Sequence, residues 1–248
     1  MKILFLDIET KPAVVSAWQT RDVNVAVNQI IRRGSIMCWA AQWYGSEDVI
    51  FDSEWTSSYK KMIKHMHDLL NEADAVCHYN GTSFDMKELN RAFLLLKLPP
   101  PSPYKNIDLY RVVRQNFRFI SNKLENISIE LGIGEKVKHS GMHLWNDVEK
   151  KDPEARRMME EYNRQDTVLL IDLFEKLKPW LKNHGLNHNM FTDKMVCPTC
   201  GSIKLQKRGY QKNHSYTYQR YQCQECATWF KSNKSIKELT KSESAINI

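Results

Sequence analysis

Hydrophobic and polar positions divide the first eighty residues into strand-like runs and one helical period. Residues 2–9 are apolar and β-prone, and they end at an acidic pair. Similar runs cover residues 35–45 and 48–52, and a short one covers residues 74–80. Residues 59–73 instead place apolar side chains at helical spacing. These patterns predict four strands and one helix.

Helical spacing dominates the following hundred residues. Residues 83–98 have a helical period that the prolines after them must stop, because proline cannot continue a helix. Residues 106–117 fit a strand or a helix, residues 122–133 fit a helix, and the longest helix is predicted over 152–178. Residues 11–34 give no clear assignment. Strands followed by helices mixed with one more strand predict an α/β domain, in which helices cover a mixed sheet.

The longest predicted helix carries a carboxylate inside its apolar stripe. At about 100° per residue, one side of this helix collects Met159, Tyr162, Asp166, Leu169, Leu173 and Leu177. A stripe of this kind packs against a sheet. A buried carboxylate without compensation costs several kcal/mol or takes up a proton. We therefore expect a partner that compensates Asp166.

Charge sets the last quarter of the chain apart. The net charge is +7, and +6 of it lies from residue 193 onward, where ten Lys and Arg face four Asp and Glu. A basic region of this kind favours an acidic partner, most simply nucleic acid, over a merely solubilising tail. At the other end, too few apolar residues precede Asp7 for a signal peptide or a membrane span.

Asp7 and Glu9 stand at alternate positions at the end of the first predicted strand. Side chains at i and i+2 point to the same face of a strand, so these two carboxylates repel each other unless a cation lies between them. Mg²⁺ and Mn²⁺ prefer such oxygen ligands. For this pair alone, a solvated acidic rim is the alternative.

Two further acidic motifs fit the same chemistry. The segment NGTSFD places Asn80 and Phe84 ahead of Asp85 at the start of a predicted helix, where a carboxylate also favours the helix N-terminus by itself. Tyr162 and Asp166 lie one helical turn apart and share a face. A metal ion shared with the first acidic pair would compensate Asp166.

The segments FLDIET, NGTSFD and YNRQD resemble, in order and spacing, the three motifs of the DEDDy family of 3′–5′ exonucleases, which includes the proofreading domains of family B DNA polymerases. The resemblance covers roughly residues 3–178. The related DEDDh group carries His five residues before its last Asp, where this chain has Glu161. The resemblance implies an RNase H-like fold and two Mg²⁺ or Mn²⁺ ions, held by Asp7, Glu9, Asp85 and Asp166.

Phosphodiester hydrolysis is the chemistry that this resemblance implies. Two metal ions about 4 Å apart can activate a water and stabilise the leaving 3′ oxygen. Tyr162 has a phenol of pKa near 10, so it would orient the attacking water rather than deprotonate it. Asn80 and Phe84 are expected to contact the nucleic acid. The complete catalytic set favours a working enzyme over a degenerate copy and comprises Asp7, Glu9, Asp85, Tyr162 and Asp166.

Four of the six cysteines have the spacing C-x2-C-x22-C-x2-C of a four-thiolate zinc ribbon: Cys197, Cys200, Cys223 and Cys226. Disulfides and an iron–sulfur cluster are weaker alternatives. The other two lie singly in strand-like runs, and this distribution favours a reducing, cytoplasmic compartment. Residues 197–230 also resemble the zinc ribbons of IS1-type transposases, which implies nucleic-acid binding, although ribbons also bind proteins.

Basic and aromatic side chains alternate between the two cysteine pairs. Cations meet phosphates and aromatic rings stack on bases, whereas covering the small metal core is the alternative for the tyrosines. The expected nucleic-acid contacts are Lys207, Arg208, Tyr210, Lys212, Tyr216, Tyr218 and Arg220.

The sequence therefore predicts an RNase H-like DEDDy exonuclease domain over 1–182, a linker over 183–195, a zinc ribbon over 196–231 and a flexible tail over 232–248. The expected function is metal-dependent 3′–5′ hydrolysis of nucleic acid from a single-stranded 3′ end, with DNA preferred and one structural Zn²⁺ in the ribbon. A ribonuclease of the same fold and a non-catalytic nucleic-acid-binding protein are the alternatives. A replication or repair protein is the second candidate partner, and no membrane contact is expected.

Overall fold

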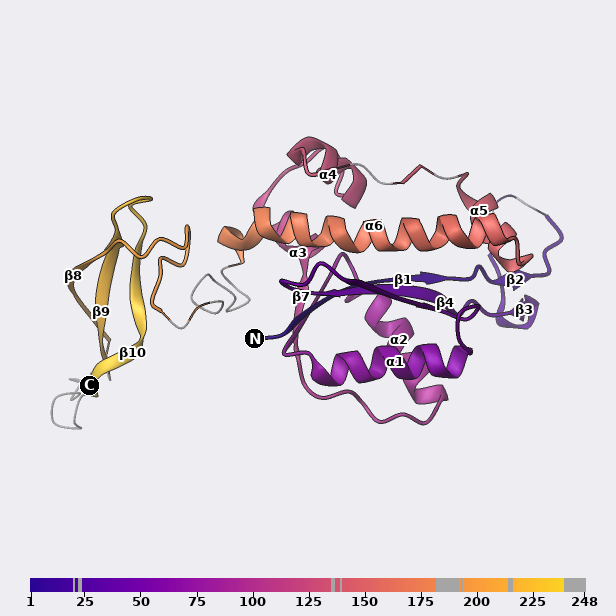
Figure 1. Ribbon diagram of the computed structural model, residues 1–248, viewed down its shortest axis with the longest axis horizontal. Coiled ribbons are helices and arrows are strands. Elements are labelled where there is room, and N and C mark those ends of the chain that lie inside the picture. Colours follow the sequence, from indigo (N-terminus) through magenta and orange to yellow (C-terminus); the bar gives the residue numbers. More distant parts are fainter. Residues whose placement is uncertain are drawn as a thin grey trace. The chain divides into compact units, whose positions relative to one another are not determined.

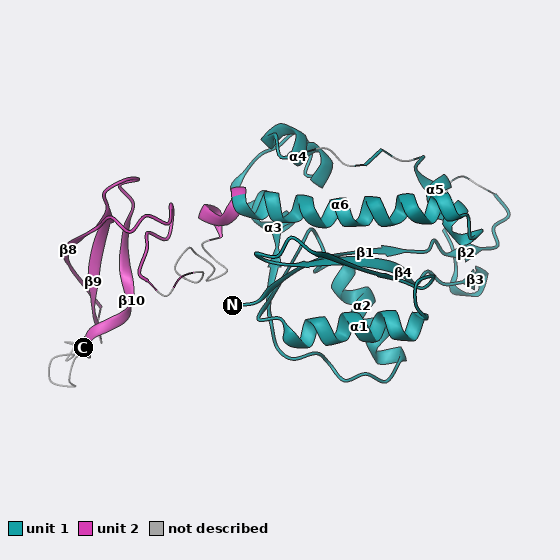
Figure 2. Ribbon diagram, viewed as in Figure 1, with its two compact units in different colours: residues 1–175 teal, residues 176–248 magenta. Residues whose placement is uncertain are grey.

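Two compact units divide the chain, residues 1–175 and residues 176–248 (Figure 2). The computed structural model describes residues 1–19, 21, 24–134, 137–138, 140–181, 192, 194–213 and 216–238. Most of the predicted linker, 183–195, therefore lies outside the described residues. Within the described part of the chain, no helix is both long and apolar enough to cross a bilayer.

A mixed five-stranded sheet forms the centre of the first unit, in the order β5-β4-β1-β6-β7 (Figure 1). Its strands are β1 Ile3–Thr10, β4 Ile36–Trp43, β5 Val49–Ser53, β6 Ala75–His78 and β7 Lys105–Asp108. The middle strand β1 is antiparallel to β4 and parallel to β6. The predicted mixed sheet is thus confirmed.

Helices cover both faces of this sheet (Figure 1). They are α1 Tyr59–Glu72, α2 Asp85–Leu95, α3 Leu109–Asn116, α4 Leu124–Leu131, α5 Met142–Glu149 and α6 Pro153–Leu177. On one face, Leu4, Leu6 and Ile8 of β1 pack with apolar side chains of α1 and α2. On the other face, Phe5 meets Phe174 of α6 edge to face, with 5.2 Å between the ring centroids. β1 therefore points alternate side chains at α1 and at α6.

Two helical segments differ from the sequence-based expectation. Residues 106–117 divide into β7 and α3, which begins directly after Asp108. The helix α5 is not predicted at all, yet it buries Leu144 and Val148 against Met159 of α6. It is only eight residues long, so its period is too short to stand out in the sequence.

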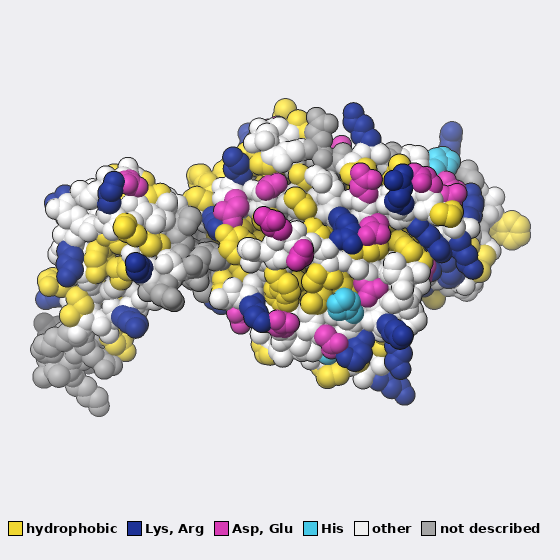
Figure 3. Space-filling model, viewed as in Figure 1, with side chains coloured by type: hydrophobic (Ala, Val, Ile, Leu, Met, Phe, Trp, Pro, Cys, Tyr) yellow, Lys and Arg dark blue, Asp and Glu magenta, His cyan; other side chains and the backbone are white. Residues whose placement is uncertain are grey.

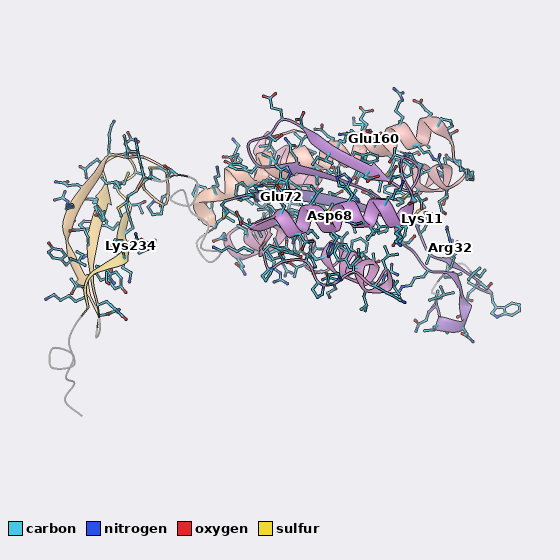
Figure 4. All side chains as sticks on the ribbon, turned by 60° about the horizontal axis from the view of Figure 1, so that its bottom comes forward. Lys11, Arg32, Asp68, Glu72, Glu160 and Lys234 are labelled. Atoms are coloured by element: carbon cyan, nitrogen blue, oxygen red, sulfur yellow. The ribbon has the colours of Figure 1, made fainter. Side chains whose placement is uncertain are left out.

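The described residues of the unassigned segment 11–34, which are 11–19, 21 and 24–34, form an arm that projects beyond the end of the sheet (Figure 4). It contains the paired strands β2 Val14–Val15 and β3 Ile30–Arg32 and the 3₁₀ turn η1 Val27–Gln29. Arg32 donates to both carboxylate oxygens of Glu149, at 2.5 and 2.8 Å, and so ties the arm to the end of α5. Strands of two or three residues leave no readable alternation in the sequence.

The second unit contains a three-stranded antiparallel sheet in the order β10-β9-β8. Its strands are β8 Leu205–Lys212, β9 Tyr216–Cys223 and β10 Trp229–Glu238. Residues 232–238 therefore belong to a strand, whereas the sequence places them in the tail. Their mostly polar composition is misleading because backbone hydrogen bonds to β9 form the strand, while its apolar Ile236 stays exposed. Residues 239–248 lie outside the described residues.

Candidate active site and candidate zinc site

Asp7 and Glu9 lie on the face of β1 that is turned toward α6. They alternate with Leu6 and Ile8, which belong to the core on the other face. The register with β4 shifts directly after Glu9. A β-bulge at a strand end re-aims the side chains beside it, and this irregularity lies next to the two carboxylates of β1.

A third carboxylate joins this pair from α6. Carboxylate oxygens of Asp7, Glu9 and Asp166 all lie within 4.8 Å of one another. Asp166 is only 3% exposed, and the other two are half-buried. Three like charges at this separation need a cation or a proton between them, and oxygen ligands suit Mg²⁺ or Mn²⁺. These residues therefore fit the divalent metal that the sequence resemblance implies.

The stripe of α6 around Tyr162 is buried as predicted, and its apolar members are Met159, Leu169, Leu173 and Leu177. The fully buried Asn163 lies beside it, and its Nδ2 donates a hydrogen bond to Oδ2 of Asp7 at 2.7 Å. This contact ties α6 to β1 at the acidic cluster. No motif indicates Asn163; its only signal in the sequence is its position next to Tyr162.

Tyr162 is buried beside the acidic cluster and is 8% exposed. Its ring meets that of Trp145 edge to face, with 6.0 Å between the centroids. Burial raises the pKa of the Tyr162 phenol above its usual value, and so do the charges of Asp166, Glu9 and Asp7 and a hydrogen bond with Asp166. The phenol therefore keeps its proton at neutral pH and acts as a hydrogen-bond donor.

Asp85 approaches the same strand from the start of α2 but does not belong to the three-carboxylate cluster. Its Oδ1 accepts a hydrogen bond at 3.4 Å from the N–H of Ile8, the residue between the two acidic positions of β1. The pairing of β1 with β6 ends at Phe5, so this N–H needs another acceptor. Burial, with help from the charge of Asp108, raises the pKa of Asp85 to about 6.

The turn between β6 and α2 is fixed by Asp108, a residue that no motif indicates. Asp108 is 2% exposed, and its carboxylate accepts hydrogen bonds from the N–H groups of Asn80 at 2.9 Å and Thr82 at 3.4 Å. Next to these, the N–H of Gly81 donates to Nδ1 of His78 at 3.0 Å. A Cβ at Gly81 would lie 2.5 Å from that ring, so only glycine fits. Asp108 and His78 together hold the segment that delivers Asp85.

Residues of all three motifs line one pocket of ≈ 460 Å³, although Glu9 and Asp85 do not. The residues that line it are Asp7, Tyr79, Asn80, Tyr110, Asn122, Lys123, Leu124, Glu125, Tyr162 and Asp166. The structure therefore brings Asn80 to the predicted site. Phe84 is 47% exposed and does not line this pocket, so its contact with nucleic acid stays a prediction.

The four predicted zinc ligands come together in the second unit. One sulfur atom from each of the four cysteines lies within 4.8 Å of all the others: Cys197, Cys200, Cys223 and Cys226. The closest pairs are 3.5 and 3.6 Å apart and form no disulfide. Hydrogen bonds with Thr228 lower the pKa of the Cys226 thiol, whereas burial raises the pKa of Cys197 and of Cys200; a metal ion binds cysteines as thiolates. This donor set fits one tetrahedral Zn²⁺.

Cations and aromatic rings pair along the strands of the ribbon. Lys231 Nζ lies 4.3 Å from the centre of the Tyr218 ring, and the Arg220 guanidinium lies 4.8 Å from that of Trp229. Tyr216 stands next to Tyr218, with 6.2 Å between the ring centroids. The face of the ribbon seen in Figure 3 carries several Lys and Arg side chains. The other predicted contacts are exposed on β8: Lys207, Arg208, Tyr210 and Lys212.

Comparisons with known proteins agree with this architecture. The RNase_H superfamily matches residues 4–178. Among solved structures, the chain is similar to the family B DNA polymerase from the hyperthermophilic archaeon Pyrobaculum calidifontis, with a TM-score of 0.58 and 17% identity. The similarity covers 88% of this chain but only 32% of the polymerase chain, and at this identity it shows the fold alone. No curated protein sequence matches the chain.

Proposed function

Since the chain belongs to the RNase H superfamily, we propose that it is a metal-dependent 3′–5′ exonuclease of the DEDDy type that hydrolyses nucleic acid, with DNA preferred, from the 3′ end. The superfamily supports a nuclease-type activity. The observation that carries the proposal is the meeting of the carboxylates of Asp7, Glu9 and Asp166 within 4.8 Å. The motif order D-x-E, N-x3-F-D and Y-x3-D supports the DEDDy subtype.

Four carboxylates would hold two Mg²⁺ or Mn²⁺ ions. Asp7, Glu9 and Asp166 offer oxygens from one cluster, and Asp85 is the proposed fourth ligand because it is hydrogen-bonded to the backbone between the two acidic residues of β1. When bound, such ions activate a water and stabilise the leaving 3′ oxygen. Asn163 fixes the Asp7 carboxylate through its amide N–H.

Tyr162 would position the attacking water. Its phenol keeps its proton, because burial and the neighbouring carboxylates raise its pKa, so it is suited to donating or accepting one hydrogen bond but not to removing a proton. Its contact with Trp145 limits the movement of the ring. A positioned group of this kind contributes rate through orientation.

The zinc ribbon would add affinity for the substrate. One structural Zn²⁺ on the four clustered thiolates would hold the strands, which present Tyr216, Tyr218, Arg220 and Lys231. Rings stack on bases and cations meet phosphates without reading sequence. The cysteines form no disulfide, which supports the proposal that the protein acts in a reducing, cytoplasmic compartment. A replication or repair protein is the proposed second partner.

A nuclease assay with end-labelled substrates tests this proposal. The full-length protein is incubated with single- and double-stranded DNA and RNA that carry a label at the 3′ or the 5′ end, in Mg²⁺, Mn²⁺ or EDTA. We expect a 5′-labelled strand to shorten stepwise and a 3′ label to be released as mononucleotide at once, and no reaction in EDTA.

Two results would overturn the proposal. Binding of nucleic acid without cleavage in either metal would favour a non-catalytic nucleic-acid-binding protein. Stepwise shortening of 3′-labelled strands would show that cleavage runs from the 5′ end instead. Faster cleavage of RNA than of DNA would replace the preferred substrate by the ribonuclease alternative.

A further inference from the structure

A second pocket, of ≈ 530 Å³, adjoins the pocket that contains the carboxylates. Asn80 and Tyr110 line both of them. The other residues that line this second pocket are Ser83, Arg111, Arg114 and Gln115. It therefore contains two cations and no acidic side chain, whereas the first pocket contains three acidic side chains.

The helix α3 turns these two arginines outward because its apolar side is buried. The buried members of α3 are Leu109, Val112 and Val113. Arg111 lies between these buried residues and Arg114 directly after them, three positions apart on the outer side of the helix, and both are exposed. The helix α3 starts directly after Asp108. Asp108 also fixes the turn that carries Asn80, so the exposed side of α3 begins close to that turn.

Each guanidinium group has a neighbour that orients it. Arg111 Nε lies 3.8 Å from Oδ2 of the buried Asp108, while the arginine side chain is 56% exposed. The Arg114 guanidinium lies 5.7 Å from the centre of the Tyr110 ring, within the range of a cation–π contact. The exposed N–H groups of such pre-oriented arginines match phosphate oxygens.

We propose that Arg111, Arg114 and Tyr110 form a subsite for the phosphodiester backbone of single-stranded nucleic acid, beside the carboxylates at which the terminal bond is cut. This inference rests on the proposed function. A strand whose end lies at the carboxylates passes Asn80 and Tyr110 to reach the arginines. An inner phosphate binds the two guanidinium groups there, and a base stacks on the Tyr110 ring.

The subsite makes the enzyme sensitive to substrate length. A dinucleotide places its one phosphodiester at the carboxylates and leaves no inner phosphate for the arginines. A longer strand gains two charge-assisted contacts. The efficiency kcat/KM is therefore higher for an oligonucleotide than for a dinucleotide, and Arg111 and Arg114 supply part of this difference.

The test uses the full-length protein and compares a dinucleotide with a single strand of about ten nucleotides, which is within the site sizes of single-strand binders. The variants are Arg111→Gln with Arg114→Gln, and Arg114→Gln alone, which leaves the contact to Asp108 in place. The matched control is Lys61→Gln with Lys64→Gln on α1, on the opposite face of the sheet. Lys64 is paired there with the neighbouring Asp68, which Figure 4 labels on α1.

We expect the double arginine variant to raise KM for the long strand on the order of 10-fold, with kcat nearly unchanged, and to lower the advantage of the long strand over the dinucleotide. Its log–log salt slope should be smaller by about 0.7, for the one inner phosphate that the two arginines bind. Arg114→Gln should give part of both effects, and the lysine control neither. Unchanged length dependence in the arginine variants, or an equal effect in the control, would overturn the subsite.

Binding distinguishes this inference from the proposed function. Fluorescence anisotropy on the zinc-loaded protein, with Mg²⁺ and Mn²⁺ omitted, measures affinity for the long strand without cleavage. If the wild-type protein binds but cuts nothing, the proposed function fails, and a loss of affinity in the arginine variants alone still supports the subsite. If affinity is equal in all variants, the subsite is wrong whatever the activity.

Discussion

At Asp166, an ionisable side chain occupies a site that disfavours its charged form. The carboxylate is almost fully buried and has two carboxylate neighbours within 4.8 Å. Burial disfavours the ionised form, and so does each neighbouring negative charge. A divalent cation reverses both effects because it replaces water and neutralises charge at the same time. The cluster should therefore cost stability in the metal-free protein, and a bound divalent ion should relieve that cost.

Tyr162→Phe should lower kcat on the order of 10–1,000-fold, the contribution usual for a positioned catalytic group. The ring stays in the stripe of α6 against Trp145, so the melting temperature should change little. Steady-state kinetics with a single-stranded oligonucleotide measure the rate. The control is Tyr59→Phe on α1, which should leave kcat unchanged; an unchanged rate in Tyr162→Phe would return this residue to a packing role.

Asp85 should make the metal-free protein less stable as pH rises. Its pKa is about 6 in the folded chain against an ordinary 3.8, so the folded state binds this proton more tightly than the unfolded state. The stabilisation is complete below the ordinary pKa and is lost as pH rises through the folded pKa. A rise of this size corresponds to roughly 3 kcal/mol.

Denaturant titrations in EDTA between pH about 4 and about 7 measure this effect against Asp85→Asn, which is neutral throughout. The free energy of unfolding of the wild type should fall across this window relative to the variant. Parallel curves would mean that Asp85 is not buried as described.

At the scale of elements, the turn between β6 and α2 depends on one carboxylate of β7. Asp108→Ala leaves the N–H groups of Asn80 and Thr82 without their acceptor. A fully buried unsatisfied donor costs about 1–3 kcal/mol, and these two donors are partly buried; the turn also positions Asp85. We expect a loss of about 2 kcal/mol or more in the free energy of unfolding and a clear drop in kcat.

Asp74→Ala is the matched control, since Asp74 also accepts a backbone N–H, that of Lys2 at 2.7 Å, but is exposed. Urea titrations and oligonucleotide kinetics on both variants check the prediction. Equal stability of the two variants would show that the turn holds its shape without Asp108.

Elements with a long apolar period could be predicted from the sequence, and elements fixed by polar contacts could not. The stripe through Tyr162 spans five turns of α6, and the carboxylate inside it indicates the site. Asp108 escapes prediction because its role lies in hydrogen bonds to residues about thirty positions earlier. The end of β10 could not be predicted because backbone pairing with β9 holds it. The arm 11–34 could not be predicted because its strands are too short to show a pattern.

In the whole molecule, the acidic motifs belong to the first unit and most of the net positive charge belongs to the second. The acidic motifs end before residue 176, whereas +6 of the net charge of +7 follows residue 192. A chain that ends near Thr192 should keep its activity on a short oligonucleotide at saturation and bind more weakly. Its log–log salt slope should be visibly smaller than that of the full chain, at about 0.7 per lost phosphate contact.

Fluorescence anisotropy across a salt series measures both chains. Circular dichroism shows whether the shortened chain is folded, and only a folded one is compared. Equal affinities and slopes would mean that the ribbon does not hold the substrate, and a protein would become its expected partner.

Manganese binding tests whether the carboxylates of β1, α2 and α6 hold divalent ions. Electron paramagnetic resonance counts free Mn²⁺ during a titration of the full-length, zinc-loaded protein, beside Asp7→Asn and the exposed control Asp68→Asn. We predict two bound Mn²⁺ per chain in the wild type and in the control, and strongly weakened binding in Asp7→Asn, which should also lose nuclease activity. Mn²⁺ binding in Asp7→Asn that equals the wild type would contradict the account.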